Sequence, residues 1–152
     1  MKQLTVKSIT DKRSVPFNVA GTGTVVTHGV AIVGTGTLFN TEMEAGSYLV
    51  NLSTNEAIKV VRKDSNTLAF LERPFTSDFA SATPQIIPWY KAKVKTLSIS
   101  ATGTILVDGE SVTNTAFSAD KAGNDRSSRR DLIEPVIVDA TAGSALIEIL
   151  NY

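Results

Sequence analysis

Short apolar segments, rich in β-branched residues and separated by glycine and polar residues, run along most of the chain. Sustained helical periodicity is scarce, and such a pattern is typical of short antiparallel strands. The first two predicted strands join at His28-Gly29, because glycine supplies the positive φ that a tight hairpin turn needs. In the first half the pattern predicts strands at 24–27, 30–33, 48–52, 57–62 and 67–72.

The segments 57–62 and 67–72 predict the clearest hairpin, around the polar turn 63–66. Leu68 and Phe70 fall on one face of its second strand, and the residues on either side of Leu68 fall on the other. That alternation is typical of a half-buried strand.

Three prolines, at 74, 84 and 88, interrupt the pattern and predict a loop and a seam between two halves. The polar stretch 116–130 that lies in the second half is expected to be an exposed loop or a short helix. The second half predicts strands at 93–100, 104–107, 111–115, 135–139 and 144–150, with a turn at 108–110.

The last predicted strand is apolar on both faces apart from Glu148. A strand of this kind lies in the middle of a sheet or under a covering neighbour. Whether that neighbour belongs to the same chain or to another subunit stays open at this point.

The expected fold class is therefore all-β, with a small antiparallel barrel-like module followed by a further antiparallel strand region and little helix. We expect the N-terminal strand and the barrel-like module to occupy residues 1–88. The C-terminal β region is expected at 89–152, with a polar arm at 116–131, and the two parts are expected to pack as one compact unit.

Composition narrows the function. Lys+Arg and Asp+Glu both number 15 among 152 residues, so the net charge is zero. A basic excess that would attract nucleic acid or an anionic membrane is missing, and the lack of self-repulsion favours assembly. The absence of cysteine excludes disulfides and thiolate metal sites and suits a reducing cytoplasm. Neither a signal-peptide core nor a run of about 20 apolar residues occurs, so we expect a soluble protein.

The segment from Gly21 to Pro88 carries an ordered series of short motifs. They are Gly23-Thr24-Val25-Val26, Val33-Gly34-Thr35-Gly36-Thr37-Leu38-Phe39, Ala45-Gly46-Ser47-Tyr48-Leu49, Ile58-Lys59-Val60-Val61, Asp64-Ser65-Asn66-Thr67-Leu68 and Arg73-Pro74-Phe75. In this order they resemble a β module that recurs in structural proteins of tailed bacteriophages, in heads, necks, baseplates and fibres. The resemblance covers a little under half of the chain and implies a virion component.

The candidate catalytic residues have simpler structural interpretations. The Gly-Thr-Gly-Thr segments lack the spacing and the following helix of a phosphate-binding loop, so we interpret them as turns. His28 is the single histidine and lies in a predicted turn, which favours a solvated side chain over a catalytic one. The carboxylate pairs Glu42 with Glu44 and Asp108 with Glu110 also lie at turns, where solvated charges are expected.

Two segments suggest interaction surfaces. Trp89 and Tyr90 follow the proline-rich seam and suit packing or a subunit contact, with sugar or base stacking as alternatives. The stretch 121–130 contains Arg126, Arg129 and Arg130 among acidic residues. It suits a solvated loop, an arm that orders on a neighbouring subunit, or a weak phosphate contact.

We therefore expect a non-enzymatic structural protein of a bacteriophage virion, foremost an auxiliary or decoration protein of the capsid present in many copies. A neck, tail or baseplate component is the alternative, and a carbohydrate-binding module is the alternative of another class. The expected partners are other virion proteins and further copies of the chain. We expect no membrane, cofactor or metal, and nucleic acid is disfavoured. The expected location is the virion, after synthesis in the host cytoplasm. The candidate interface residues are Trp89, Tyr90, Arg126, Arg129, Arg130, Leu146, Ile147, Ile149 and Leu150.

Overall fold

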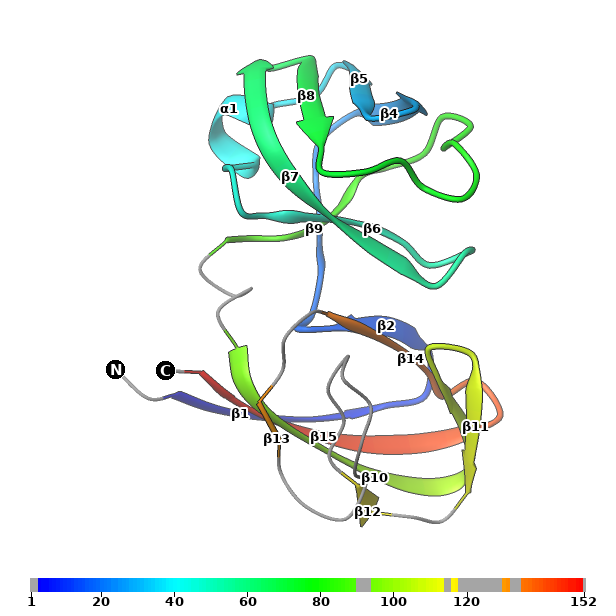
Figure 1. Cartoon of the computed structure of the whole chain (residues 1–152). Coiled ribbons are helices and arrows are strands. Elements are labelled where there is room, and N and C mark those ends of the chain that lie inside the picture. The colour runs from blue at the N-terminus through cyan, green and yellow to red at the C-terminus, as the bar shows by residue number, and fades with distance from the viewer. Residues whose placement is uncertain (1–2, 90–93, 114–115, 118–129, 132–134, 152) are drawn as a thin grey trace. The chain divides into compact units, whose positions relative to one another are not determined.

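The computed structural model describes residues 3–89, 94–113, 116–117, 130–131 and 135–151 (Figure 1). Its elements are antiparallel strands with a single four-residue helix, α1 (Phe39–Glu42), among the described residues. The predicted all-β class is confirmed, and one of the sheets curls into half a barrel.

The chain divides into two compact units. The central unit, named for its place in the sequence, is Phe17–Ala92, and the terminal unit combines Met1–Pro16 with Lys93–Tyr152. The sequence had placed the first sixteen of these residues with the module that ends at 88. The structure groups them with the C-terminal residues instead, because the strands they form pair with strands near the C-terminus.

The central unit holds a seven-stranded antiparallel sheet in the order β3-β9-β6-β7-β8-β5-β4. Its hydrophobic core includes Ile32, Phe39, Leu49 and Ile58, which come from the strands and from α1. The strands are β3 (Val19–Ala20), β4 (Thr24–His28), β5 (Ala31–Thr35), β6 (Tyr48–Asn51), β7 (Glu56–Ser65), β8 (Leu68–Leu71) and β9 (Gln85–Ile87).

The predicted first hairpin is confirmed as β4–β5, with its turn one residue later than expected. His28 pairs with Ala31, so the turn consists of Gly29 and Val30. Gly29 has φ of 61°, and glycine at the first turn position matches the twist of the two strands.

The second predicted hairpin is confirmed as β7–β8, but β7 is longer than expected and the turn moves to Asn66-Thr67. Ala69 and Leu71 of β8 are buried, whereas Leu68 and Phe70 are half-buried. The predicted alternation is therefore confirmed. Ala69 and Leu71 face the core, and Leu68 and Phe70 lie on the opposite face. Bulges in β7 near Val60 and Lys63 set this register.

The terminal unit contains an eight-stranded sheet whose main path is β1-β15-β10-β14-β2, and three short strands also pair with β10. Its strands are β1 (Gln3–Ile9), β2 (Lys12–Val15), β10 (Val94–Val107), β11 (Glu110–Thr113), β12 (Ala116–Phe117), β13 (Arg130–Asp131), β14 (Val136–Asp139) and β15 (Gly143–Asn151).

Strand β10 is one continuous strand where the sequence predicted two, at 93–100 and 104–107. Up to Gly103 it pairs with β15, and beyond it pairs with β11 and β14. Gly103 has φ of +77°, a conformation that lets the strand bend and change partners without ending.

Of the two positions predicted for the last strand, the structure shows the middle of a sheet. β15 lies between β1 and β10 of the same chain, so both neighbours are intramolecular. The predicted turn at 108–110 is also present, as Asp108 and Gly109 with positive φ, and Asp108 Oδ1 accepts a hydrogen bond from the Ile137 N–H at 2.8 Å. Of the polar stretch 116–130, residues 118–129 lie outside the described residues.

Candidate functional site

The predicted aromatic pair is described at Trp89 only, since Tyr90 lies outside the described residues. The Trp89 side chain is 42% exposed, and its backbone N–H donates to Ser47 Oγ at 3.1 Å. Trp89 therefore follows Pro88 on the surface of the central unit, and its backbone N–H is bonded to the turn that precedes β6.

The candidate residues of the last strand separate by face. Leu146 is 41% exposed, whereas Ile147 and Ile149 are buried in the core of the terminal unit. Their side chains are consequently not available to a second subunit, and Leu146 alone keeps that role among these three. Leu150 pairs through its backbone with Leu4 and with Thr96.

The predicted basic arm is described at one of its three arginines. Arg130 lies in β13, where it pairs with Leu97. Arg126 and Arg129 lie outside the described residues, so the three interpretations of this stretch stay as they were.

One face of the terminal unit's sheet presents apolar side chains to solvent. Leu146 pairs with Ser8 and with Ser100, so these residues share a face with Val6, which is 54% exposed. Val6 lies on β1, an edge strand that pairs only with β15 among the strands described here. An edge strand with an exposed apolar residue is a surface on which another chain can pair or pack.

The outer face of the central unit's sheet is also apolar, and sequence analysis did not identify it. Val26, Val33 and Leu68 form one cross-strand row, and Val33 is exposed. In the next row the guanidinium of Arg62 lies 4.2 Å from the centroid of the Phe70 ring. The signal was present in the neighbouring apolar pairs 25–26 and 32–33, which place an apolar residue on both faces of β4 and β5.

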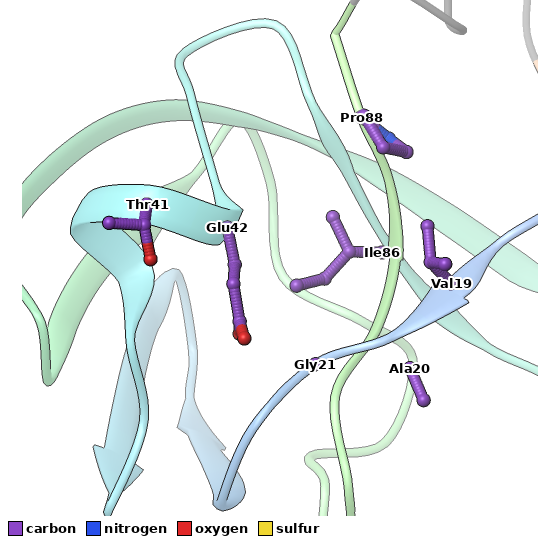
Figure 2. A pocket seen from close by; sticks show the side chains of 7 residues that line it. All are labelled: Val19, Ala20, Gly21, Thr41, Glu42, Ile86 and Pro88. Atoms are coloured by element: carbon purple, nitrogen blue, oxygen red, sulfur yellow. The ribbon is translucent and has the colours of Figure 1, made fainter.

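A pocket of about 260 Å³ opens on the central unit (Figure 2). Glu42 extends from α1 toward Gly21, and the Ile86 side chain extends from β9 toward Glu42, while Val19 of β3 is paired with Ile86. The pocket is lined by Val19, Ala20, Gly21, Thr41, Glu42, Ile86 and Pro88.

The position of Glu42 follows from how α1 is attached to the β7–β8 turn. The Asn66 carbonyl accepts from the Phe39 N–H at 3.3 Å, and Asn66 Oδ1 accepts from the Asn40 N–H at 2.9 Å. The carboxylate of Glu42 accepts hydrogen bonds from the backbone N–H and the hydroxyl of Thr22. These contacts hold one carboxylate at the rim of a mostly apolar hollow.

The remaining candidate chemistry has structural partners or solvent around it. His28 is exposed at the end of β4. Glu42 bonds Thr22, while the Glu44 carboxylate pairs with Lys63 Nζ at 3.0 Å, so the two carboxylates have separate partners. The interpretation of the Gly-Thr-Gly-Thr segments as turns agrees with the positive φ of Gly23 and Gly36.

Within the described ranges, no group of three or more His, Asp and Glu side chains is placed to hold a metal ion. None of the helices in those ranges has the length and apolar character to cross a membrane. In comparisons with known proteins, no family model, curated protein or solved structure matches the chain.

Proposed function

We propose that this chain is a structural subunit of a bacteriophage virion, foremost an auxiliary or decoration protein of the capsid that assembles in many copies. The observation that carries the proposal is the ordered motif series from Gly21 to Pro88, which resembles a module of phage structural proteins. In the structure most residues of these motifs lie in the strands and turns of the seven-stranded sheet, while Phe39 begins α1 and Arg73-Pro74-Phe75 follow β8.

The exposed side chains of the sheets support an assembly role. Val6 and Leu146 lie on one face of the terminal unit, and Val33 lies on an outer face of the central unit. Each such contact is small, but repetition around a symmetric shell multiplies weak contacts through effective concentration. A neck, tail or baseplate position would use the same surfaces in fewer copies.

A carbohydrate-binding function is the second candidate, and the exposure of Trp89 is the observation that favours it. An indole on the surface can stack on a sugar ring. Under this alternative, Trp89→Ala abolishes binding to a glycan array while the protein still folds and still assembles. Under the structural proposal, the same variant leaves glycan binding at the background of the unmodified chain.

Quantitative mass spectrometry and imaging of purified phage particles test the main proposal. We expect the chain to be present in many copies and to appear as density on the capsid lattice. A copy number that matches a ring on the tail axis moves the protein to the neck or tail. Absence of the chain from purified particles rejects the virion assignment.

A further inference from the structure

The pocket of Figure 2 is slightly smaller than typical small-molecule sites. Its volume is about 260 Å³, whereas small-molecule sites span roughly 300–1,000 Å³. Its residues all belong to the central unit, so its shape depends on this unit alone. A hollow of this size suits one side chain of a larger molecule.

The walls of the pocket are mostly apolar and partly open to solvent. Val19 is 47% exposed at the rim, while Ile86 is buried behind it and Pro88 is half-buried. A run of methylene groups laid along Val19 and Ile86 would remove apolar surface from water on both partners. The walls therefore favour an unbranched aliphatic stem.

Glu42 adds a charge without a counter-charge. Neighbouring carboxylates have cations: Glu44 pairs with Lys63 and Glu56 lies 3.9 Å from Arg73. Among the described residues, no lysine or arginine pairs with Glu42, whose bonds go to Thr22. A half-buried carboxylate beside an apolar wall attracts a cation more strongly than one in open solvent.

The geometry of these bonds distinguishes between cations. Thr22 donates to both carboxylate oxygens of Glu42 from the same side, through its hydroxyl and its N–H. An arginine fork needs both oxygens from one direction, whereas an ammonium group needs a single remaining lone pair. The site therefore suits lysine better than arginine.

We propose that this pocket receives a lysine side chain from a neighbouring protein subunit, with the stem on Val19 and Ile86 and the ammonium group on Glu42. The identity of the neighbour as a subunit rests on the proposed function. The chemistry of the pocket does not, and it can be tested in solution with the chain alone.

The test is a titration of the full chain, labelled with ¹⁵N, with Nα-acetyl-lysine methylamide, followed by NMR. The matched ligand is Nα-acetyl-norleucine methylamide, which has the same stem without the ammonium group. We expect the lysine compound to shift the amide signals of residues 19–21, 41–42 and 86. We expect at least about fivefold weaker binding of the norleucine compound, the scale of one partly exposed ion pair.

Two variants probe the two parts of the site. Glu42→Gln removes the charge and is expected to weaken lysine binding about fivefold, while Glu72→Gln, an exposed carboxylate elsewhere in the central unit, leaves it unchanged. If Glu42→Gln disturbs the fold through its Thr22 bonds, Val19→Ser supplies a second variant. It keeps Glu42, shortens the apolar wall and is also expected to weaken binding.

Equal binding of the lysine and norleucine compounds, shifts outside the pocket, or tighter binding of the arginine analogue would overturn the proposal. The two proposals fail separately. If the chain is found on phage particles but the amide signals of the pocket residues do not shift with the lysine compound, only the lysine site is rejected. Lysine binding at Glu42 by a chain that is absent from particles rejects the virion role and keeps the site.

Discussion

Single glycines in the Gly34-Thr35-Gly36-Thr37 segment serve different purposes. A Cβ at Gly34 would collide with the buried side chain of Thr37, whose hydroxyl donates to the Asn66 carbonyl. Gly36 has open space around it but a φ of +66°. The same residue type is thus required once by packing and once by backbone conformation.

We predict that Gly34→Ala destabilises the central unit more than Gly36→Ala does. The first change forces Thr37 to move and endangers its hydrogen bond, which together cost roughly 3 kcal/mol. The second adds only the strain of a left-handed alanine, about 1 kcal/mol. Urea unfolding followed by tryptophan fluorescence and circular dichroism measures both, and a larger loss for Gly36→Ala would contradict the packing explanation.

Asp139 shows an electrostatic effect at the scale of one side chain. The hydroxyl and the N–H of Thr141 donate to its carboxylate, and these bonds, helped by the charge of Lys12 on the paired strand, hold the pKa of Asp139 below its usual 3.8. A lowered pKa means that the folded state favours the ionised form.

We predict that Thr141→Ala raises the pKa of Asp139 part of the way toward 3.8, because it removes the hydroxyl bond, the largest cause of the shift, while the backbone N–H of residue 141 still donates. The stability that Asp139 contributes is complete above its unfolded pKa and disappears as the pH falls from about 3.8 through the folded pKa. A carboxyl titration by NMR measures the shift. Lys12→Gln is the control, with a smaller expected rise, and an unmoved pKa in Thr141→Ala would contradict the assignment.

At the scale of elements, β15 shows how one strand serves two purposes. Alternation places Ile147 in the core and Leu146 on the exposed face beside β1. The sequence identified both as apolar and as candidate interface residues. The sequence did not separate the two residues, because β15 is apolar on both faces. Only the packing of the unit decides which of the two faces is buried.

We predict opposite effects from neighbouring substitutions in β15. Ile147→Ala leaves a cavity in the core and costs roughly 2–5 kcal/mol of unfolding free energy. Leu146→Ser changes stability by no more than about 0.5 kcal/mol, since its side chain is already partly hydrated, but it reduces binding of the chain to phage particles. Chemical unfolding and particle co-sedimentation measure the two effects; particle binding that is unchanged in Leu146→Ser removes this face from the assembly surface.

The bend in β10 is a further property of an element that sequence analysis missed. A Cβ at Gly143 would lie 2.5 Å from the Thr102 carbonyl oxygen, so β15 begins in close contact with β10. The sequence pattern predicted two separate strands, at 93–100 and 104–107, and so left residues 101–103 outside both. Here the glycines at 103 and 143 meet, and their lack of side chains lets β10 continue past the bend.

At the scale of the whole molecule, the two units differ in continuity. The central unit is one segment, Phe17–Ala92, whereas the terminal unit needs both ends of the chain. Its strands β1 and β2 pair with β15 and β14. The predicted seam near residue 88 lies close to the observed boundary after residue 92, while the boundary after Pro16 had no signal in the hydrophobic pattern.

We predict that residues 17–92 fold alone, because their core and all seven strands of their sheet lie within the segment. Residues 93–152 alone are expected not to fold, since they lack β1 and β2, which pair with the sides of β15 and β14 that face away from β10. NMR spectra of the two fragments test this prediction. We expect dispersed amide signals for residues 17–92 and no such dispersion for residues 93–152. The matched control is the mixture of the second fragment with a peptide of residues 1–16, which is expected to restore order.

The sequence by itself determined the all-β class, the positions of most strands and the approximate positions of the hairpin turns, because alternation and turn chemistry act over a few neighbouring residues. Only the tertiary structure decided which strands pair, that residues 1–16 join the C-terminal sheet, and that Glu42 and Val19 line the same pocket. The physical reason is that backbone hydrogen bonds between strands are nearly independent of side chains. A strand's pattern therefore specifies its period and not its partner.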